Sequence, residues 1–255
     1  MKKIILVFSF LGLFSAFSFG QLIDEKNVTV TMDLQPILQL NMTTSDQVDF
    51  VFDDIRDYYG GIIKYAATIL KVSSSVSWDL YAVGTSQAGV IWDQQMTYST
   101  SANPLSQNDL PLSLLELHQY EDNQNDLGAL LITDYSNTFQ PTMTAIPVMG
   151  QNSIYNSAAP YTAPAVGQKY INGMFGTGVD QGGEGGSYLT EVPVAGSFSE
   201  FYYTIDYRIV PSLPATFPFA GTNAGAADAN AIVSPQYAEP GVYTMNCKYV
   251  LLEDQ

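Results

Sequence analysis

Cysteine and histidine are almost missing from this chain, because its 255 residues contain one of each, Cys247 and His118. A single cysteine excludes an intrachain disulfide, so packing must stabilise the fold. Zinc and copper sites use several His or Cys ligands, and this composition offers no basis for one. We interpret Cys247 as a small buried apolar residue, with an intermolecular disulfide or a reactive thiol as the alternative.

Basic residues are also scarce. Nine Lys and Arg stand against 25 Asp and Glu, which gives a formal charge of −16. Such an acidic surface repels nucleic acid and anionic membranes, so we expect no nucleic-acid partner. After residue 20 the chain has no apolar run near the roughly 18 residues that cross a bilayer. We therefore expect no membrane span in the mature chain.

A recognisable catalytic set is the third absence. His118 follows Glu116 by two residues, but no G-x-S-x-G elbow accompanies the pair, and we interpret His118 as structural. Acidic pairs can hydrolyse glycosides, and the densest acidic groups are residues 53–57 and Asp180 with Glu184. The latter two lie in a Gly-rich loop that could instead wrap Ca²⁺, although without the spacing of an EF-hand. The sequence predicts no catalytic residue and no cofactor.

The chain opens with the pattern of a secretory leader. Lys2 and Lys3 precede an apolar run over residues 4–14, and small residues follow. This pattern predicts a signal peptide over residues 1–20 and a secreted domain over residues 21–255. Loss of the two lysines would change the formal charge from −16 to −18. No cysteine stands at the predicted cleavage site, which argues against a lipoprotein anchor.

Strict alternation of apolar and polar residues predicts strands. Behind the leader, an apolar set alternates with a polar one, as is typical of a half-buried strand: Val28, Val30, Met32 and Leu34 against Thr29, Thr31 and Asp33. Similar segments are residues 62–69, 77–82, 203–209 and 242–252. Residues 53–59 and 112–120 do not decide between helix and strand.

These patterns predict an all-β fold, an antiparallel immunoglobulin-like β-sandwich with long loop insertions. The insertions are rich in Gly, Pro and Asn and lie near residues 140–190 and 211–239. Insertions of this length are usually functional or mobile. Two lobes are the alternative to one sandwich.

Aromatic residues are plentiful, with 17 Tyr and two Trp. Flat rings can serve as platforms for sugars, and they also supply much of a core. For ligand binding the candidates lie in loop-rich surroundings: Trp92, Tyr155, Tyr161 and Tyr170. For the core the candidates lie in alternating segments: Trp78, Leu80, Tyr243, Cys247 and Tyr249.

Two short motifs suggest a relationship. Residues 78–80 read Trp-Asp-Leu in an early strand, and residues 241–244 read Gly-Val-Tyr-Thr before the last strand. In these features the chain resembles bacterial WxL-like surface domains and fimbrial-type cell-surface β-sandwich proteins. It departs from the WxL pattern at residues 249–251, which read Tyr-Val-Leu where Trp-x-Leu is expected. The resemblance implies adhesion, attachment to cell wall or polysaccharide, or assembly into fibres.

We therefore expect a non-enzymatic extracellular structural or adhesive protein of the bacterial surface, for example a subunit of a surface fibre or appendage. Its expected partners are further copies of itself, other cell-surface proteins or polysaccharide. The first mature strand and the last strand are candidate edge elements, through which subunits commonly add to one another. A carbohydrate-binding module using the exposed aromatics is the alternative, and a secreted hydrolase is the third.

Overall fold

Strands dominate the computed structural model of the chain, and the expectation of an all-β protein with antiparallel sheets is confirmed. The structure describes residues 26, 28–98, 106–120, 123, 134–139, 152–157, 160–165, 169–174, 183, 185–189, 201–211 and 237–254. Two units are distinguished, residues 1–35 and residues 36–255, and the strands belong to the second. The predicted leader lies outside the described residues, as do Asp180 and Glu184.

Eleven strands and two short helices are assigned in the described parts of the chain. In sequence order they are β1 (Leu38–Met42), α2 (Ile55–Gly60), β2 (Ile62–Ser74), β3 (Trp78–Thr85), β4 (Asp93–Thr97), β5 (Ser106–Gln107), η1 (Leu112–Leu114), β6 (Leu115–Gln119), β7 (Gly186–Ser187), β8 (Tyr202–Ile209), β9 (Tyr237–Ala238), β10 (Gly241–Thr244) and β11 (Asn246–Glu253). No helix within these parts is long and apolar enough to cross a membrane.

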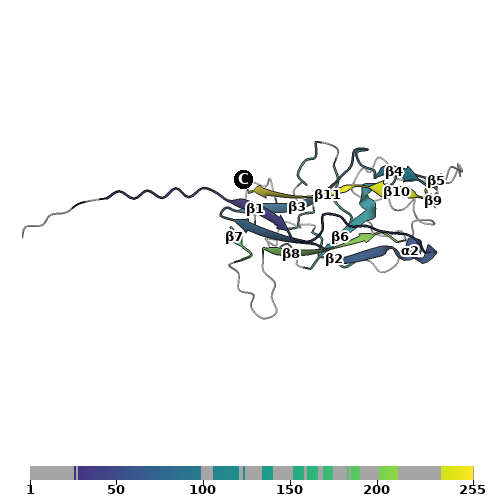
Figure 1. Cartoon of the computed structure of the whole chain (residues 1–255), viewed down its shortest axis with the longest axis horizontal. Helices are drawn as coiled ribbons and strands as arrows, with labels where there is room; N and C mark the ends of the chain where they lie inside the picture. The colour runs from purple at the N-terminus through teal and green to yellow at the C-terminus, as the bar shows by residue number, and fades with distance from the viewer. Residues whose placement is uncertain are drawn as a thin grey trace, which may run out of the picture. The chain divides into compact units, whose positions relative to one another are not determined.

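The largest sheet has the order β1-β2-β8-β6, with every pair antiparallel (Figure 1). The long strand β2 pairs with β1 along one edge and with β8 along the other, and β7 pairs with its C-terminal end. The outer side of β6 bonds to the chain near Ser153, because Leu117 N–H donates to Asn152 O and Ile154 N–H donates to Leu115 O. These pairings join segments that lie far apart in the sequence.

A second group of strands is built from the C-terminal residues. β11 pairs antiparallel with β3, and β10 pairs antiparallel with β4. The side of β3 away from β11 is occupied, since the N–H groups of Trp78, Leu80 and Gly84 donate to carbonyls of residues 183, 172 and 155. The alternating run over residues 242–252 is therefore two strands, interrupted at Met245.

The main core takes side chains from both groups of strands. Its buried members include residues of β2, β3, β6 and β8: Leu70, Val72, Trp78, Leu80, Ala82, Leu115, Leu117, Tyr203, Ile205, Tyr207 and Ile209. A smaller cluster contains Tyr81 and Val83, whose side chains lie on the opposite face of β3 from the main core, together with Tyr170 and Met174. The rings of Tyr81 and Tyr170 meet edge to face. Alternate residues of β3 thus serve two cores, as its uninterrupted burial reflects. The immunoglobulin-like sandwich itself stays a prediction.

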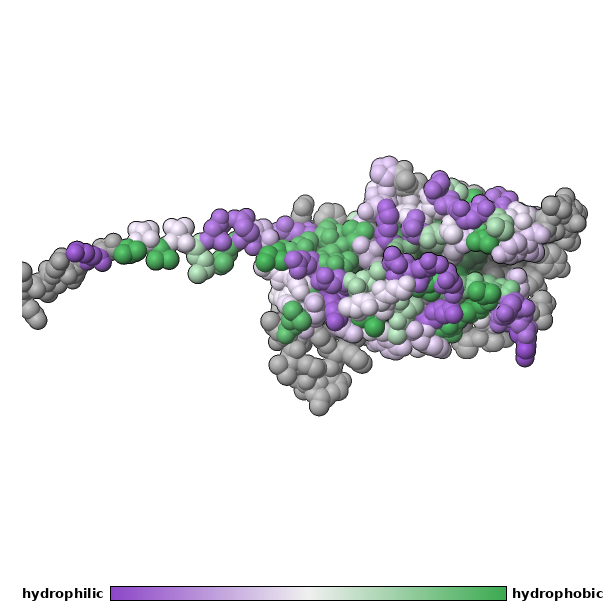
Figure 2. Space-filling model, viewed as in Figure 1, coloured by the Kyte–Doolittle hydropathy of each residue, from purple (hydrophilic) through white to green (hydrophobic). Residues whose placement is uncertain are grey.

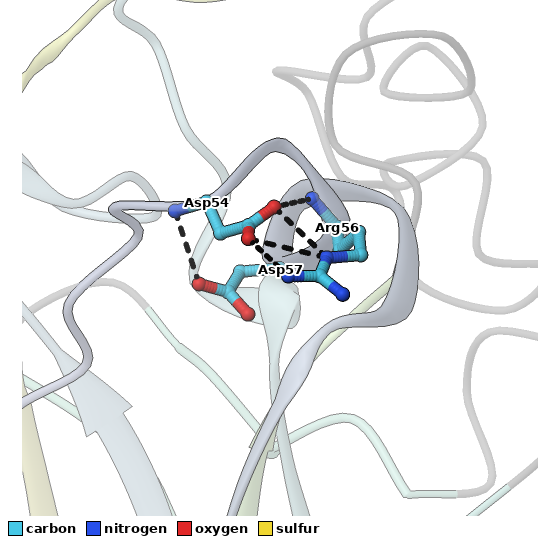
Figure 3. A network of polar contacts seen from close by, with 3 residues as sticks. All are labelled: Asp54, Arg56 and Asp57. Atoms are coloured by element: carbon cyan, nitrogen blue, oxygen red, sulfur yellow. Dashed lines mark hydrogen bonds and ion pairs between the residues drawn. The ribbon is translucent and has the colours of Figure 1, made fainter.

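The two ambiguous segments resolve differently. Residues 112–120 contain η1 and β6, whereas residues 53–59 contain most of a short helix. Residues 53–59 contain the N-terminus of α2, where Asp54 accepts from Arg56 N–H at 2.9 Å and Asp57 accepts from Asp54 N–H at 3.3 Å (Figure 3). This is a capping box, and the side chain of Arg56 also bonds to Asp54 at 2.7 Å. The hydrogen bonds from Arg56 lower the pKa of Asp54. Two members of the acidic group at residues 53–57 therefore have a structural role as a helix cap.

Candidate functional site

An extended segment, which we call the arm (residues 28–34), presents its apolar side chains to solvent. Their exposed fractions are 84% for Val28, 85% for Val30, 78% for Met32 and 81% for Leu34. Figure 2 shows the alternation directly, with green residues along one side of the segment and white or purple ones along the other. Single exposed apolar residues are ordinary on protein surfaces, but four in strict alternation are not.

The sequence predicted a half-buried strand here, and the structure shows an extended segment without a strand partner. No backbone hydrogen bond is found for residues 28–34, all of which are described. Within the arm, the carboxylate of Asp33 accepts a hydrogen bond from Gln35 Nε2 at 2.6 Å. Alternation records which residues share a face, but it does not specify what covers that face.

One unpaired strand edge belongs to β1. Ser75 N–H donates to Ile37 O, and Thr43 N–H donates to Ile69 O, so the odd-numbered residues of β1 bond to β2. In an antiparallel pair the alternate residues direct their N–H and C=O groups to the other side. Leu38 and Leu40 therefore turn their backbone outward, while their side chains pack on the main core. In the described chain no other strand pairs with this edge.

A second unpaired edge belongs to β11. Asp254 N–H donates to Ser77 O at 3.0 Å, which continues the register in which Leu252 opposes Asp79. The even-numbered residues of β11 therefore bond to β3, and the odd-numbered ones direct their backbone groups away from it. Within the described part of the chain β11 pairs with β3 alone. β1 lies beside β11, and some Cα atoms of the two strands come within 8 Å.

Polar side chains gather where β6 and β8 pair. His118 Nδ1 lies 3.1 Å from Asp206 Oδ2, and Arg208 Nε donates to Glu116 Oε2 at 2.5 Å. Burial raises the pKa of Glu116, and the bond to Arg208 opposes this shift. Lys169 Nζ donates to Ser153 O at 2.5 Å, and burial lowers its pKa to about 7.

Among the residues that the structure describes, this cluster does not form a hydrolytic set. The described contacts of His118 are Asp206 and the rings of Tyr120 and Phe139, with no hydroxyl or thiol hydrogen-bonded to it. Glu116, the predicted neighbour of His118, pairs with Arg208 instead. In the part of the chain that the structure describes, no three acidic, His or Cys side chains are grouped closely enough to hold a metal ion.

The four aromatic candidates for ligand binding do not form one platform. Trp92 is partly buried against the main core, and its Nε1 donates to Pro111 O at 3.2 Å. Tyr170 is fully buried, so its ring offers no face to a ligand, and Tyr155 packs on the same small cluster. Tyr161 is 36% exposed, and the ammonium of Lys248 lies 5.1 Å from its ring centre. Carbohydrate binding stays a prediction, with Tyr161 as its exposed ring.

The predicted core positions lie as follows. Trp78 and Leu80 are fully buried in the main core, and Tyr243, Cys247 and Tyr249 are partly buried against it. The thiol of Cys247 lies 3.9 Å from the hydroxyl of Tyr207. Burial raises the pKa of the Cys247 thiol to about 11. A thiol with so high a pKa is a poor nucleophile at neutral pH.

Among the described residues, the fold and these features define an all-β protein with an exposed strand-like arm and with unpaired strand edges that include those of β1 and β11. No protein-family model and no curated protein matches the chain significantly. Sequence reasoning predicted the first and last strands as edge elements; β11 has an unpaired edge among the described residues, whereas residues 28–34 are not a strand, and Lys248, exposed on β11, was missed. Its position amid apolar residues of an alternating segment was the available signal.

Proposed function

We propose that this protein is a non-enzymatic extracellular structural protein whose copies associate through the arm, as in a surface fibre or appendage. The observation that carries the proposal is the exposure of four apolar side chains at alternate positions of an extended segment without backbone partners. A segment of this kind is suited to adding as a strand to an open sheet edge. The predicted leader supports an extracellular location.

The energetics favour an arm that is buried on association. Removing one Val, Leu or Met side chain from water contributes about 1.5–3 kcal/mol, so the four together contribute about 6–12 kcal/mol. Association costs about 4–15 kcal/mol, which is of the same size. Backbone hydrogen bonds to an unpaired edge add about 0.5–1.5 kcal/mol each. We therefore expect association that depends on protein concentration and is sensitive to single changes in the arm.

Sedimentation velocity over a range of concentrations tests this proposal. We expect the chain without residues 1–20 to form oligomers and the variant Val30→Asp with Met32→Asp to remain monomeric. The matched control is Ser45→Asp with Gln47→Asp, which adds the same charge at exposed positions outside the arm and should retain oligomers. A parent protein that is strictly monomeric at every concentration would overturn the proposal.

A further inference from the structure

The odd-numbered residues of β11 combine inward side chains with outward backbone groups. Cys247, Tyr249 and Leu251 pack on the main core, while their N–H and C=O groups point away from β3. Directly opposite residues of two paired strands share one face of the sheet. A strand that adds to this edge must therefore place an apolar side chain opposite each of these three residues.

The arm meets this requirement when its even-numbered residues oppose the odd-numbered residues of β11. We propose that the arm of one copy pairs antiparallel with the outer edge of β11 in a second copy, with Asp33 opposite Lys248. This inference rests on the self-association proposed above. In this register three apolar residues of the arm cover the core-facing positions: Leu34 opposite Cys247, Met32 opposite Tyr249 and Val30 opposite Leu251.

Charge selects this register among those that the alternation allows. A shift of two residues in either direction would place Asp33 opposite Asn246 or Val250, and neither carries a charge. Lys248 is exposed on the face of β11 away from the main core, where its ammonium lies over the ring of Tyr161 and where Val250 and Leu252 pack on the smaller cluster. Opposite charges at directly facing positions stabilise a strand pair. Thr31 then faces Val250 and Thr29 faces Leu252, and such β-branched residues suit a pleated surface.

The direction of the arm follows from the break at Met245. Antiparallel pairing places the arm opposite residues 247–253, which all lie in the uninterrupted strand β11. Parallel pairing with the same contact between Asp33 and Lys248 would run the arm across Met245 into β10, where the register with β4 also shifts. Regular hydrogen bonding is therefore available only to the antiparallel arm.

The neighbouring strand β1 must yield to the incoming arm. A strand hydrogen-bonded on both sides would separate its two neighbours by about 9.6 Å, twice the spacing of paired strands. Some Cα atoms of β1 and β11 lie within 8 Å of each other. The arm therefore pairs with β11 and moves β1 away where the two strands are closest.

Disulfide trapping between two differently tagged copies tests the site and its direction. In a Cys247→Ala background one copy carries Thr29→Cys, and the other carries Leu252→Cys for antiparallel pairing or Thr244→Cys for parallel pairing. With glutathione disulfide as oxidant, we expect covalent dimers with Leu252→Cys and at most a tenth of that yield with Thr244→Cys. A third partner, Asn41→Cys, reports on the edge of β1 and should also give little product.

Charge exchange tests the register. We expect Asp33→Lys and Lys248→Asp each to weaken association about three- to tenfold, and the two together to restore most of it. The control Asp46→Lys makes the same charge change at an exposed residue outside the arm and should cost less. Unfolding midpoints of all variants verify that the domain is intact.

Each failure has a distinct reading. Oligomers that need the arm but trap with Thr244→Cys or Asn41→Cys would overturn the β11 register and leave the proposed function in place. An intrachain disulfide in a monomer carrying both Thr29→Cys and Leu252→Cys would show that the arm folds onto its own chain, which overturns the inference. Absence of any association, with no trapped product, would overturn both proposals.

Discussion

The hydroxyl groups of Tyr207 and Tyr249 lie 2.6 Å apart and join β8 of the largest sheet to β11. Thr68 of β2 extends the contact, because its Oγ1 lies 2.7 Å from the hydroxyl of Tyr207. A buried chain of hydroxyls thus crosses the main core between the two groups of strands. Burial raises the pKa of both tyrosines, which keeps both hydroxyls protonated near neutral pH.

Loss of one hydroxyl from this chain should destabilise the fold. We expect Tyr249→Phe to lower the free energy of unfolding by about 1–2 kcal/mol, because the hydroxyl of Tyr207 loses a buried partner. Urea denaturation followed by fluorescence measures the change. Tyr98→Phe is the control, since Tyr98 is largely exposed and should have little effect. An unchanged midpoint for Tyr249→Phe would contradict a role for this contact.

Lys169 should make stability rise with pH above neutrality. Burial lowers its pKa in the folded chain to about 7, from a usual value of 10.5. Between these values the unfolded chain binds the proton and the folded chain does not, so falling pH favours unfolding. We expect the free energy of unfolding to increase from pH 7 to about pH 9–10. Urea titrations at intervals of one pH unit measure this slope.

The variant Lys169→Met separates this contribution from that of other groups. It should flatten the slope between pH 7 and pH 9, because no proton is then exchanged at this position. Above about pH 10 both proteins should lose stability, since burial raises the pKa of Tyr135 and Tyr249 and the unfolded chain releases those protons first. Equal slopes in parent and variant would rule out Lys169 as the source.

Ala66 has a backbone conformation that glycine adopts more readily. Its φ is 48°, and its N–H donates to Asp206 Oδ1 at 2.7 Å, within the irregular part of the β2–β8 pairing. We expect Ala66→Gly to stabilise the protein by about 0.5 kcal/mol, because relief of strain exceeds the added entropy of the unfolded chain. Thermal unfolding measures the effect. Ala67→Gly, without a positive φ, should destabilise, and a loss in both variants would contradict the argument.

Much of the strand pattern was predictable from local alternation. The segments near β2, β3, β8 and β11 read correctly because one or both faces are buried, and burial imposes a period of two. Partners were not predictable, since pairs such as His118 and Asp206 stand 88 residues apart. A sequence period carries no information on which distant segment lies alongside.

The arm illustrates the same limit for the candidate site. Its alternation predicted a half-buried strand, yet the structure shows an extended segment that is not a strand and whose two faces are exposed. Alternation of apolar and polar residues looks the same in the sequence whether the apolar face is covered by another molecule or by the chain's own core. Only the structure distinguishes the two, because it shows which apolar faces the folded chain has already covered.

Removal of the arm should leave the monomer as stable as before. Residues 28–34 make no backbone hydrogen bond within the described part of the chain, and their apolar side chains are exposed. We expect deletion of these residues to change the free energy of unfolding of dilute protein by less than about 0.5 kcal/mol. Urea denaturation at low protein concentration measures it. A large loss would mean that the arm stabilises its own domain and would favour folding onto the same chain.

Between β1 and α2 the chain offers an unusual combination. Val48, Phe50 and Phe52 pack against the main core, yet residues 48–53 make no backbone hydrogen bond to another described residue. Amide protons there should exchange with deuterium nearly as fast as in a peptide, although the side chains beside them are held in place. Among the described residues this stretch is held by side-chain packing, so its displacement from the core would break no backbone hydrogen bond between described strands.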